Sequence, residues 1–166
     1  ISDNIISAYE CLHFMKRNRS KNNNYCALKL DMMKAYDRVE WSYLKAIMEK
    51  LGFAAPWFSV IMNIVSSVSF SVMFNGSKLE EFRPSRGIRQ GDPISPYVFL
   101  LAADGLLCLL KSQQQSSQLC GIKVAPTAPE VNHLLFADDS LLFFRASIDG
   151  AEKVSHLLDT YYMASG

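Results

Sequence analysis

The spacing of apolar residues along the chain predicts a mixture of helices and short strands. Apolar residues that recur every three or four positions mark the buried side of a helix, whereas short apolar runs and strict alternation mark strands. Helices are predicted over residues 4–16, 41–51, 56–66, 97–110 and 147–163. Strands are predicted over residues 25–30, 69–74, 79–82, 131–137 and 140–144, and loops over the polar stretches 16–24, 83–92 and 112–117.

Local sequence signals set several of these boundaries. Asp37 and Glu40 have the spacing of a capping box, with Asp37 as the cap of the helix that follows. Ser95-Pro96 has the form of a helix start, with the serine as cap and the proline in the first turn. Asn75-Gly76 lies between two strand-like runs and predicts a tight hairpin turn.

Long helices combined with antiparallel strand pairs predict an α+β fold, with one sheet and helices packed on one of its faces. The 166 residues are enough for one domain with its own core, spanning residues 1–166. The apolar share of 49% and the charged share of 20% are typical of a folded globular chain. We therefore expect a single α+β domain.

Two apolar stretches reach the length of a membrane span. Residues 51–74 carry no charge, but Pro56 and Asn63 interrupt them. Residues 93–110 are also apolar, but Asp104 lies within them. Both stretches are interpreted as core segments, and no membrane partner is expected. The second of them is apolar on almost every face of its helix, which predicts that this helix is buried.

Charge and cysteine content narrow the classes of protein and site. The net charge of +1 provides no general basic field, which disfavours a free-standing nucleic-acid-binding module. The cysteines show no C-x-x-C spacing, so neither a zinc site nor a disulfide framework is predicted and a reducing compartment is expected. Cys108 lies in an apolar run and is predicted to be a small core residue.

Three aspartates lie at the ends of hydrophobic strands. Asp31 ends the apolar run 25–30, and Asp138 and Asp139 separate the last two predicted strands. Aspartate is common at turns, so a turn alone also explains each motif. However, adjacent acids repel each other unless a cation neutralises them, and a carboxylate beside an apolar sheet is costly unless it is paired or binds a metal.

A metal site follows if these strands lie side by side. Asp31 and Asp138 then converge with Asp139 close by, and carboxylate oxygens are the ligands that Mg²⁺ prefers. Two such ions roughly 4 Å apart activate an attacking hydroxyl and stabilise the leaving group of a displacement at phosphorus. We therefore predict two Mg²⁺ ions held by these three acids, with Mn²⁺ as an alternative ion.

The polar loop before the fourth predicted helix combines glycines with hydrogen-bond donors. Gly87 and Gly91 let the backbone bend freely and approach a ligand closely. Arg86, Arg89 and Gln90 offer donors for phosphates or base edges. A glycine-containing loop is also an ordinary entry to a helix, and the Gly-Lys-Ser/Thr ending of a Walker A loop is missing.

Tyr36 lies five residues after Asp31 and has two interpretations. It is either a core aromatic residue that leads into the next helix or a ring that packs beneath the sugar of a nucleotide. Its spacing alone does not choose between them.

Taken together, these segments resemble reverse transcriptases of the non-LTR (LINE-type) retrotransposons, especially those of plant genomes. Leu30–Trp41 is similar to their motif A, Arg86–Tyr97 to motif B and Leu135–Leu141 to motif C. Ile1–Ile5 resembles the segment that follows the finger region. The three motifs occur in the expected order and, with the opening segment, cover essentially the whole chain, which makes the joint match specific.

The resemblance implies a polymerase palm, a small antiparallel sheet backed by helices. Asp31 and Asp138 match the metal-binding acids of the family, and Asp139 matches the third acid of the site. All three are therefore implied to be catalytic.

The resemblance also implies the residues that contact the nucleotide. Tyr36 matches the residue that discriminates against the 2′-hydroxyl of the incoming nucleotide. Arg89, Gln90 and Gly91 match the loop that touches the nucleotide and the template.

The implied reaction is RNA-templated DNA synthesis, in which the 3′-hydroxyl of a primer attacks the α-phosphate of a dNTP. The implied partners are an RNA template, a DNA primer, dNTPs, and the finger and thumb regions of a parent polyprotein. Those regions would lie before Ile1 and after Gly166, so we expect a partial domain truncated at both ends. The resemblance also implies that the protein acts inside the cell, in the nucleus.

Two alternatives to an active polymerase remain open. One is a retrotransposon remnant that has lost catalysis, although the presence of all three acids favours recent function. The other is a nucleic-acid-binding module, which the low net charge and the absence of a basic aromatic platform disfavour.

Overall fold

The computed structural model describes residues 2–18, 24–136 and 139–166, and these residues form two compact units. Unit 1 consists of Ile1–Met33 and Leu106–Tyr161, and unit 2 of Lys34–Gly105 and Tyr162–Gly166. The chain passes from one unit to the other after Met33, within α5 (Ser95–Gln115) and within α6 (Ile148–Ser165).

Unit 1 is built on a three-stranded antiparallel sheet with the strand order β1-β5-β4. The strands are β1 (Tyr25–Asp31), β4 (His133–Phe136) and β5 (Asp139–Arg145). The strands predicted over residues 25–30, 131–137 and 140–144 are confirmed, with boundaries shifted by up to two residues.

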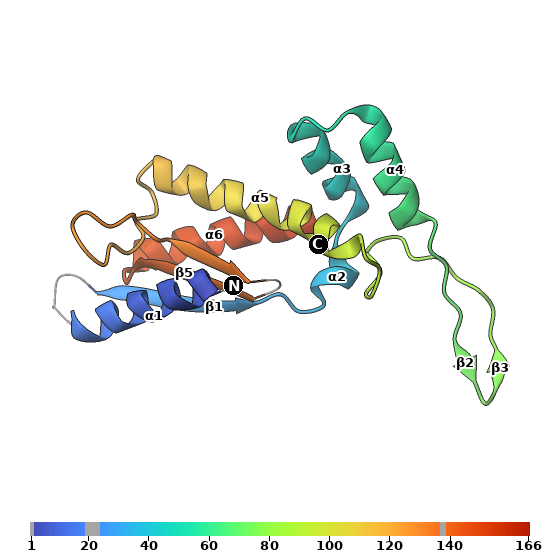
Figure 1. The fold of residues 1–166 in the computed structure, drawn as a ribbon, viewed down its shortest axis with the longest axis horizontal. Helices are drawn as coiled ribbons and strands as arrows, with labels where there is room; N and C mark the ends of the chain where they lie inside the picture. The colour runs from blue at the N-terminus through green and yellow to red at the C-terminus, as the bar shows by residue number, and fades with distance from the viewer. Residues whose placement is uncertain (1, 19–23, 137–138) are drawn as a thin grey trace. The chain divides into compact units, whose positions relative to one another are not determined.

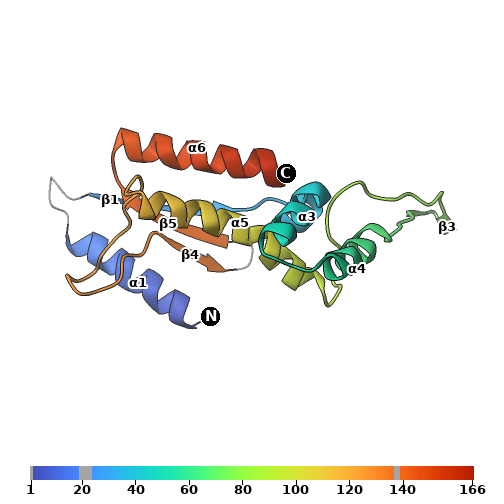
Figure 2. The same ribbon diagram turned by 90° about the horizontal axis from the view of Figure 1, so that it is seen from above.

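Helices cover both faces of this sheet. On one face, Leu142 and Phe144 of β5 pack with buried residues of α5 and α6. On the other face, Phe143 packs with Cys11 of α1 (Ser2–Arg17) and with Ile122. Figure 2 shows α1 and α6 on opposite sides of the strands. The prediction that helices cover one face was wrong, because neighbouring residues of β5 are apolar and bury opposite sides of the strand.

Unit 2 contains three whole helices, a hairpin, the first part of α5 and the end of α6. The helices are α2 (Ala35–Arg38), α3 (Trp41–Lys50) and α4 (Ala55–Ser66), and the hairpin consists of β2 (Met73–Phe74) and β3 (Ser77–Lys78). Figure 1 shows the hairpin extending beyond the end of α4. Asn75 and Gly76 both have positive φ, at 47° and 81°, as the predicted two-residue turn requires.

The five predicted helices are confirmed, with boundaries shifted by up to five residues, and two local predictions were wrong. The capping box was wrong, because Asp37 lies inside the short helix α2 and the N-cap residue of α3 is Glu40, which makes no side-chain capping bond. The loop predicted over residues 112–117 was wrong in its first part, because α5 continues to Gln115.

The predicted burial of α5 on all faces was also wrong. Val98, Leu106 and Leu110 are buried, but Leu100 is 60% exposed. Cys108 is exposed and is not the core residue that its apolar neighbours predicted. Among the described helices, α5 has the length and apolar composition that would suffice to cross a membrane, and 44% of its most apolar stretch is buried within the protein.

Replacing Phe143 with alanine should destabilise unit 1 strongly. Phe143 is fully buried between the sheet and α1, so its truncation leaves a cavity and should cost about 3–5 kcal/mol of unfolding free energy. Phe74→Ala is the matched control, because Phe74 is 63% exposed on the hairpin and should change stability by less than about 0.5 kcal/mol. Urea unfolding of both variants measures the difference, and equal losses would contradict the assigned core.

Candidate functional site

The end of the β1–β5 ladder brings two of the predicted acids together. Asp31 is the last residue of β1, Asp139 is the first residue of β5, and the antiparallel register pairs them directly. Opposite residues in such a ladder have Cα atoms roughly 4.5–5.5 Å apart and side chains on the same face. The two strands therefore lie side by side, which is the condition that the predicted metal site requires, and the metal-binding role of the acids stays a prediction. Asp138 lies outside the described residues.

Lys29 joins this pair of acids and was missed in the sequence. Its Nζ atom lies 2.9 Å from Oδ1 of Asp139. Lys29 precedes Asp31 by two residues, so the period of the strand places both side chains on one face. That alternation, Lys-Leu-Asp at the end of an apolar run, was the signal in the sequence that could have found it. The lysine offsets part of the repulsion between the two opposed carboxylates.

The acids fit the ligand requirements of a divalent cation. Asp31 is exposed and the side chain of Asp139 is 46% exposed, so their oxygens are accessible from solvent. Hard cations such as Mg²⁺ take carboxylate oxygens and retain several waters, which an accessible pair permits. The Lys29 ion pair contributes only about 0–1 kcal/mol at this exposure, so an incoming cation displaces it at little cost.

The ladder that carries the acids is fixed from its opposite face. Leu30 and Leu142 pack in the core that β1 and β5 share with α5 and α6. Ser140, which follows Asp139, is also buried, and its hydroxyl has no hydrogen-bond partner among the described residues. The backbone at the acidic end is therefore held by buried neighbours while the carboxylates remain accessible.

The predicted nucleotide-contacting residues belong to unit 2. The ring of Tyr36 stacks on Phe99 of α5, with the ring centroids 5.1 Å apart and the planes 12° from parallel. Tyr36 is half-buried. It makes the contact that a core aromatic residue would make, and its role in nucleotide selection stays a prediction.

The loop with the two glycines lies against the segment that follows Tyr36. The backbone N–H of Ile88 donates to the carbonyl of Tyr36, and that of Gly87 donates to the carbonyl of Val39, both at 2.8 Å. The side chain of Gln90 donates to Oδ1 of Asp37 at 3.4 Å. Tyr36 and Gln90, which the sequence predicted to act on one nucleotide, therefore belong to two directly bonded segments.

The two glycines of the loop serve different needs. Both have positive φ, 88° at Gly87 and 85° at Gly91. A Cβ atom on Gly87 would lie 2.8 Å from the carbonyl oxygen of Asp37, so the close approach there is to the chain's own backbone. A Cβ atom on Gly91 would meet nothing within 4 Å, so Gly91 is required by its conformation alone.

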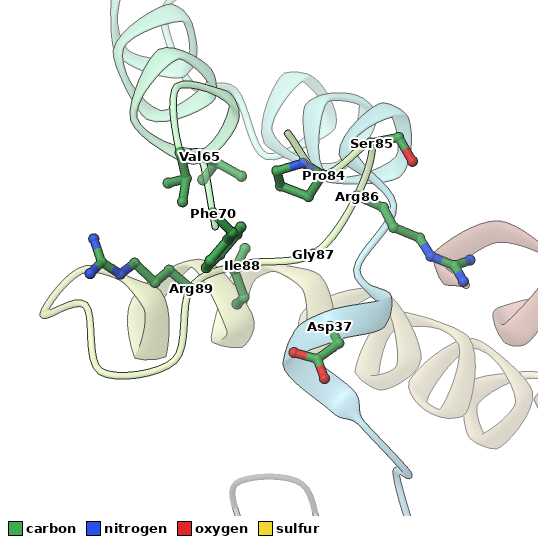
Figure 3. Close-up of a pocket in the computed structure, with 10 residues that line it drawn as sticks. Asp37, Val65, Phe70, Pro84, Ser85, Arg86, Gly87, Ile88 and Arg89 are labelled. Atoms are coloured by element: carbon green, nitrogen blue, oxygen red, sulfur yellow. The ribbon is translucent and has the colours of Figure 1, made fainter. Parts of the chain in front are cut away.

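A cavity of about 330 Å³ lies beside this loop within unit 2. Its polar lining includes Arg86, Arg89 and Asp37, and its apolar lining includes Val65 and Phe70. Figure 3 shows the two arginine side chains pointing in opposite directions from the loop. The apolar lining residues were missed in the sequence, because α4 and the start of the hairpin carry no signal that links them to the loop.

The structure thus forms two groups of predicted site residues, each within one unit. Asp31 and Asp139 form the first group, in unit 1. Tyr36, Arg89, Gln90 and Gly91 form the second group, in unit 2.

The sequence matches the model of one protein family along nearly its whole length. Residues 3–163 match the family described as "Reverse transcriptase (RNA-dependent DNA polymerase)". This range includes all three acids and the glycine-containing loop.

Two similar curated proteins are described as products of transposable elements. An uncharacterized 149 kDa protein of transposon TX1 from Xenopus laevis is 28% identical over 165 residues, which are 99% of this chain and 12% of that protein. A retrovirus-related Pol polyprotein from a type-1 retrotransposable element R2 of Popillia japonica is 29% identical over 137 residues, which are 82% of this chain and 22% of that protein. The chain thus spans less than a quarter of the length of either relative.

A solved structure supports the fold. Telomerase from Candida albicans, in complex with a fragment of telomeric RNA, aligns with 99% of this chain and 28% of that chain at a TM-score of 0.64 and 14% identity. The predicted α+β fold of the reverse transcriptase type is confirmed. The resemblance to non-LTR reverse transcriptases, based on the three motifs, is confirmed as well. The chain belongs to the reverse transcriptase (RNA-dependent DNA polymerase) family.

Proposed function

We propose that this chain is the palm of an RNA-directed DNA polymerase that acts in retrotransposition. The observation that carries the proposal is the direct pairing of Asp31 with Asp139 at the end of the β1–β5 ladder, in a chain that matches the reverse transcriptase family. The similarity to a Pol polyprotein of a retrotransposable element supports an RNA template as substrate. The similarity to a telomerase bound to telomeric RNA is consistent with it.

In the proposed reaction, the 3′-oxygen of a DNA primer attacks the α-phosphorus of a dNTP. A new phosphorus–oxygen bond forms, the bond to the oxygen that bridges to the β-phosphate breaks, and pyrophosphate leaves. Asp31, Asp138 and Asp139 would hold two Mg²⁺ ions, with Mn²⁺ as an alternative. When bound, such ions supply activation of the attacking hydroxyl and neutralisation of charge on the leaving group.

The residues of unit 2 would bind and orient the incoming nucleotide. Arg89 and Gln90 are exposed and offer N–H donors to phosphates or base edges. Gly91 has open space where a side chain would lie, which leaves room for a ligand beside the backbone. Tyr36, held by its stacking on Phe99, would present its ring to the sugar and exclude a 2′-hydroxyl.

The proposed partners are an RNA template, a DNA primer, dNTPs and the finger and thumb regions of a longer polyprotein. The relatives are several times longer than this chain, which is consistent with further regions. We also propose an intracellular, nuclear site of action, on the basis of the family alone.

Replacing Asp138 or Asp31 with asparagine should abolish Mg²⁺-dependent primer extension by the polymerase with its finger and thumb regions. An amide keeps the shape of the side chain but loses the negative charge that binds the metal, and we expect extension to fall about 1000-fold or more, equivalent to about 4 kcal/mol. Steady-state extension assays measure the rate, and a gel-shift assay should show template binding unchanged.

Asp159→Asn is the matched control for that prediction, because Asp159 is exposed on α6 and the substitution removes the same charge. Its extension rate should equal that of the parent protein. Equal rates for Asp138→Asn and the parent protein would refute the two-metal assignment.

Replacing Tyr36 with alanine should admit ribonucleotides. Loss of the ring removes the steric barrier to a 2′-hydroxyl, and we expect the ratio of kcat/KM for a dNTP to that for the matching NTP to fall about 10- to 100-fold. Tyr162→Ala is the control, because Tyr162 is 56% exposed at the end of α6. An unchanged ratio in Tyr36→Ala would remove Tyr36 from this role.

A further inference from the structure

The peptide group between Gly87 and Ile88 is held at both of its ends by the segment that carries Tyr36. Its carbonyl oxygen, on Gly87, accepts a hydrogen bond from Nε1 of Trp41 at 2.7 Å. Its N–H, on Ile88, donates to the carbonyl of Tyr36 at 2.8 Å. Because a peptide group is planar, fixing its oxygen and its N–H fixes its orientation.

The surroundings leave this peptide few other partners. Gly87 and Ile88 are buried, so their backbone groups cannot exchange these bonds for water without opening the loop. The close approach of Gly87 to the backbone of Asp37 brings the two segments into direct contact. The indole N–H of Trp41, half-buried at the start of α3, is the side-chain donor in this arrangement.

Two further contacts join the same segments but lie in solvent. Arg86 pairs with Glu40 at 3.2 Å, and Gln90 reaches Asp37 at 3.4 Å. Exposed contacts of this kind contribute little. The bond from Trp41 is therefore the side-chain contact on which the fit of the loop against the Tyr36 segment depends most.

We propose that Trp41 is a positioning residue for nucleotide selection. By fixing the Gly87–Ile88 peptide, Trp41 sets the position of Arg89 and Gln90, which follow that peptide, relative to the ring of Tyr36. A nucleotide bound by this loop then meets Tyr36 at one defined distance, which is what discrimination at the 2′-carbon requires. The inference rests on the proposed polymerase function.

Trp41→Phe tests the proposal, because it keeps an aromatic ring but removes the N–H donor. The chain contains two tryptophans, and the second, Trp57 on α4 of the same unit, is 66% exposed, which makes Trp57→Phe the matched control. The first measurement is amide hydrogen exchange of segments 36–41 and 86–92 in the chain without nucleic acid. Trp41→Phe should accelerate exchange in both segments roughly 3- to 10-fold, as expected for the loss of one hydrogen bond, and Trp57→Phe should not.

The second measurement is nucleotide selection by the polymerase with its finger and thumb regions. Trp41→Phe should raise KM for dNTPs about 5- to 10-fold, change kcat less than about 2-fold, and lower the preference for dNTPs over NTPs, while Trp57→Phe leaves all three unchanged. If the parent protein extends no primer, the proposed polymerase function fails, and hydrogen exchange still tests whether Trp41 holds the loop.

Two outcomes would overturn the inference. Unchanged exchange in both segments would show that the indole bond does not hold the peptide. Faster exchange with unchanged KM and unchanged nucleotide preference would show that Trp41 supports only the fold. If Trp41→Phe does not fold, replacing Trp41 with 3-benzothienylalanine, which exchanges the N–H for sulfur in a ring of similar shape, gives the same two readouts.

Discussion

The antiparallel pairing of β1 with β5 is the constraint on which the candidate metal site depends. It places Asp31 opposite Asp139, and a slip of one residue would move one carboxylate to the other face of the sheet. The register is set by apolar residues close to the acids on both strands, which alternate between two cores. Leu28 and Leu142 face one core and Phe143 faces the other, so a slip would expose apolar groups on both sides at once. A register slip that moved the acids would therefore also expose core residues to water, and the lost burial disfavours it.

The same ladder places like charges opposite each other, which on its own is unfavourable. Lys29 offsets part of this repulsion from the same face, with its ammonium group on the carboxylate of Asp139. A protein that only needed a stable strand end would gain more from an uncharged pair there. An accessible acidic pair with a weakly held lysine is instead consistent with a site whose charge is balanced by exchangeable cations.

The sequence predicted the parts of the fold that local pattern determines. The five helices, the three strands of unit 1 and the Asn75-Gly76 turn follow from periodicity and turn chemistry. The strands predicted over residues 69–74 and 79–82 were too long, because the hairpin is paired only at Met73–Phe74 with Ser77–Lys78 and at an isolated bridge between Phe70 and Phe82. The sequence did not predict features that depend on contacts with segments far away along the chain. Cys108 follows the apolar pattern of its helix but lies on an exposed face, because periodicity does not show which faces a neighbour covers. The bond from Trp41 to Gly87 joins residues 46 positions apart, and no local signal marks either of them as a partner of the other.

Gly87 and Gly91 have the same backbone conformation but different surroundings. Gly87 is explained without any ligand, because its positive φ and the backbone of Asp37 exclude a side chain. Gly91 has the same backbone conformation, which alone favours glycine, and the space around it is open. The internal contact at Gly87 fixes the loop, and the space beside Gly91 follows directly after the exposed donors of Arg89 and Gln90. Under the proposed function, the nucleotide would lie at residues 89–91, while residues 86–88 hold the loop in place.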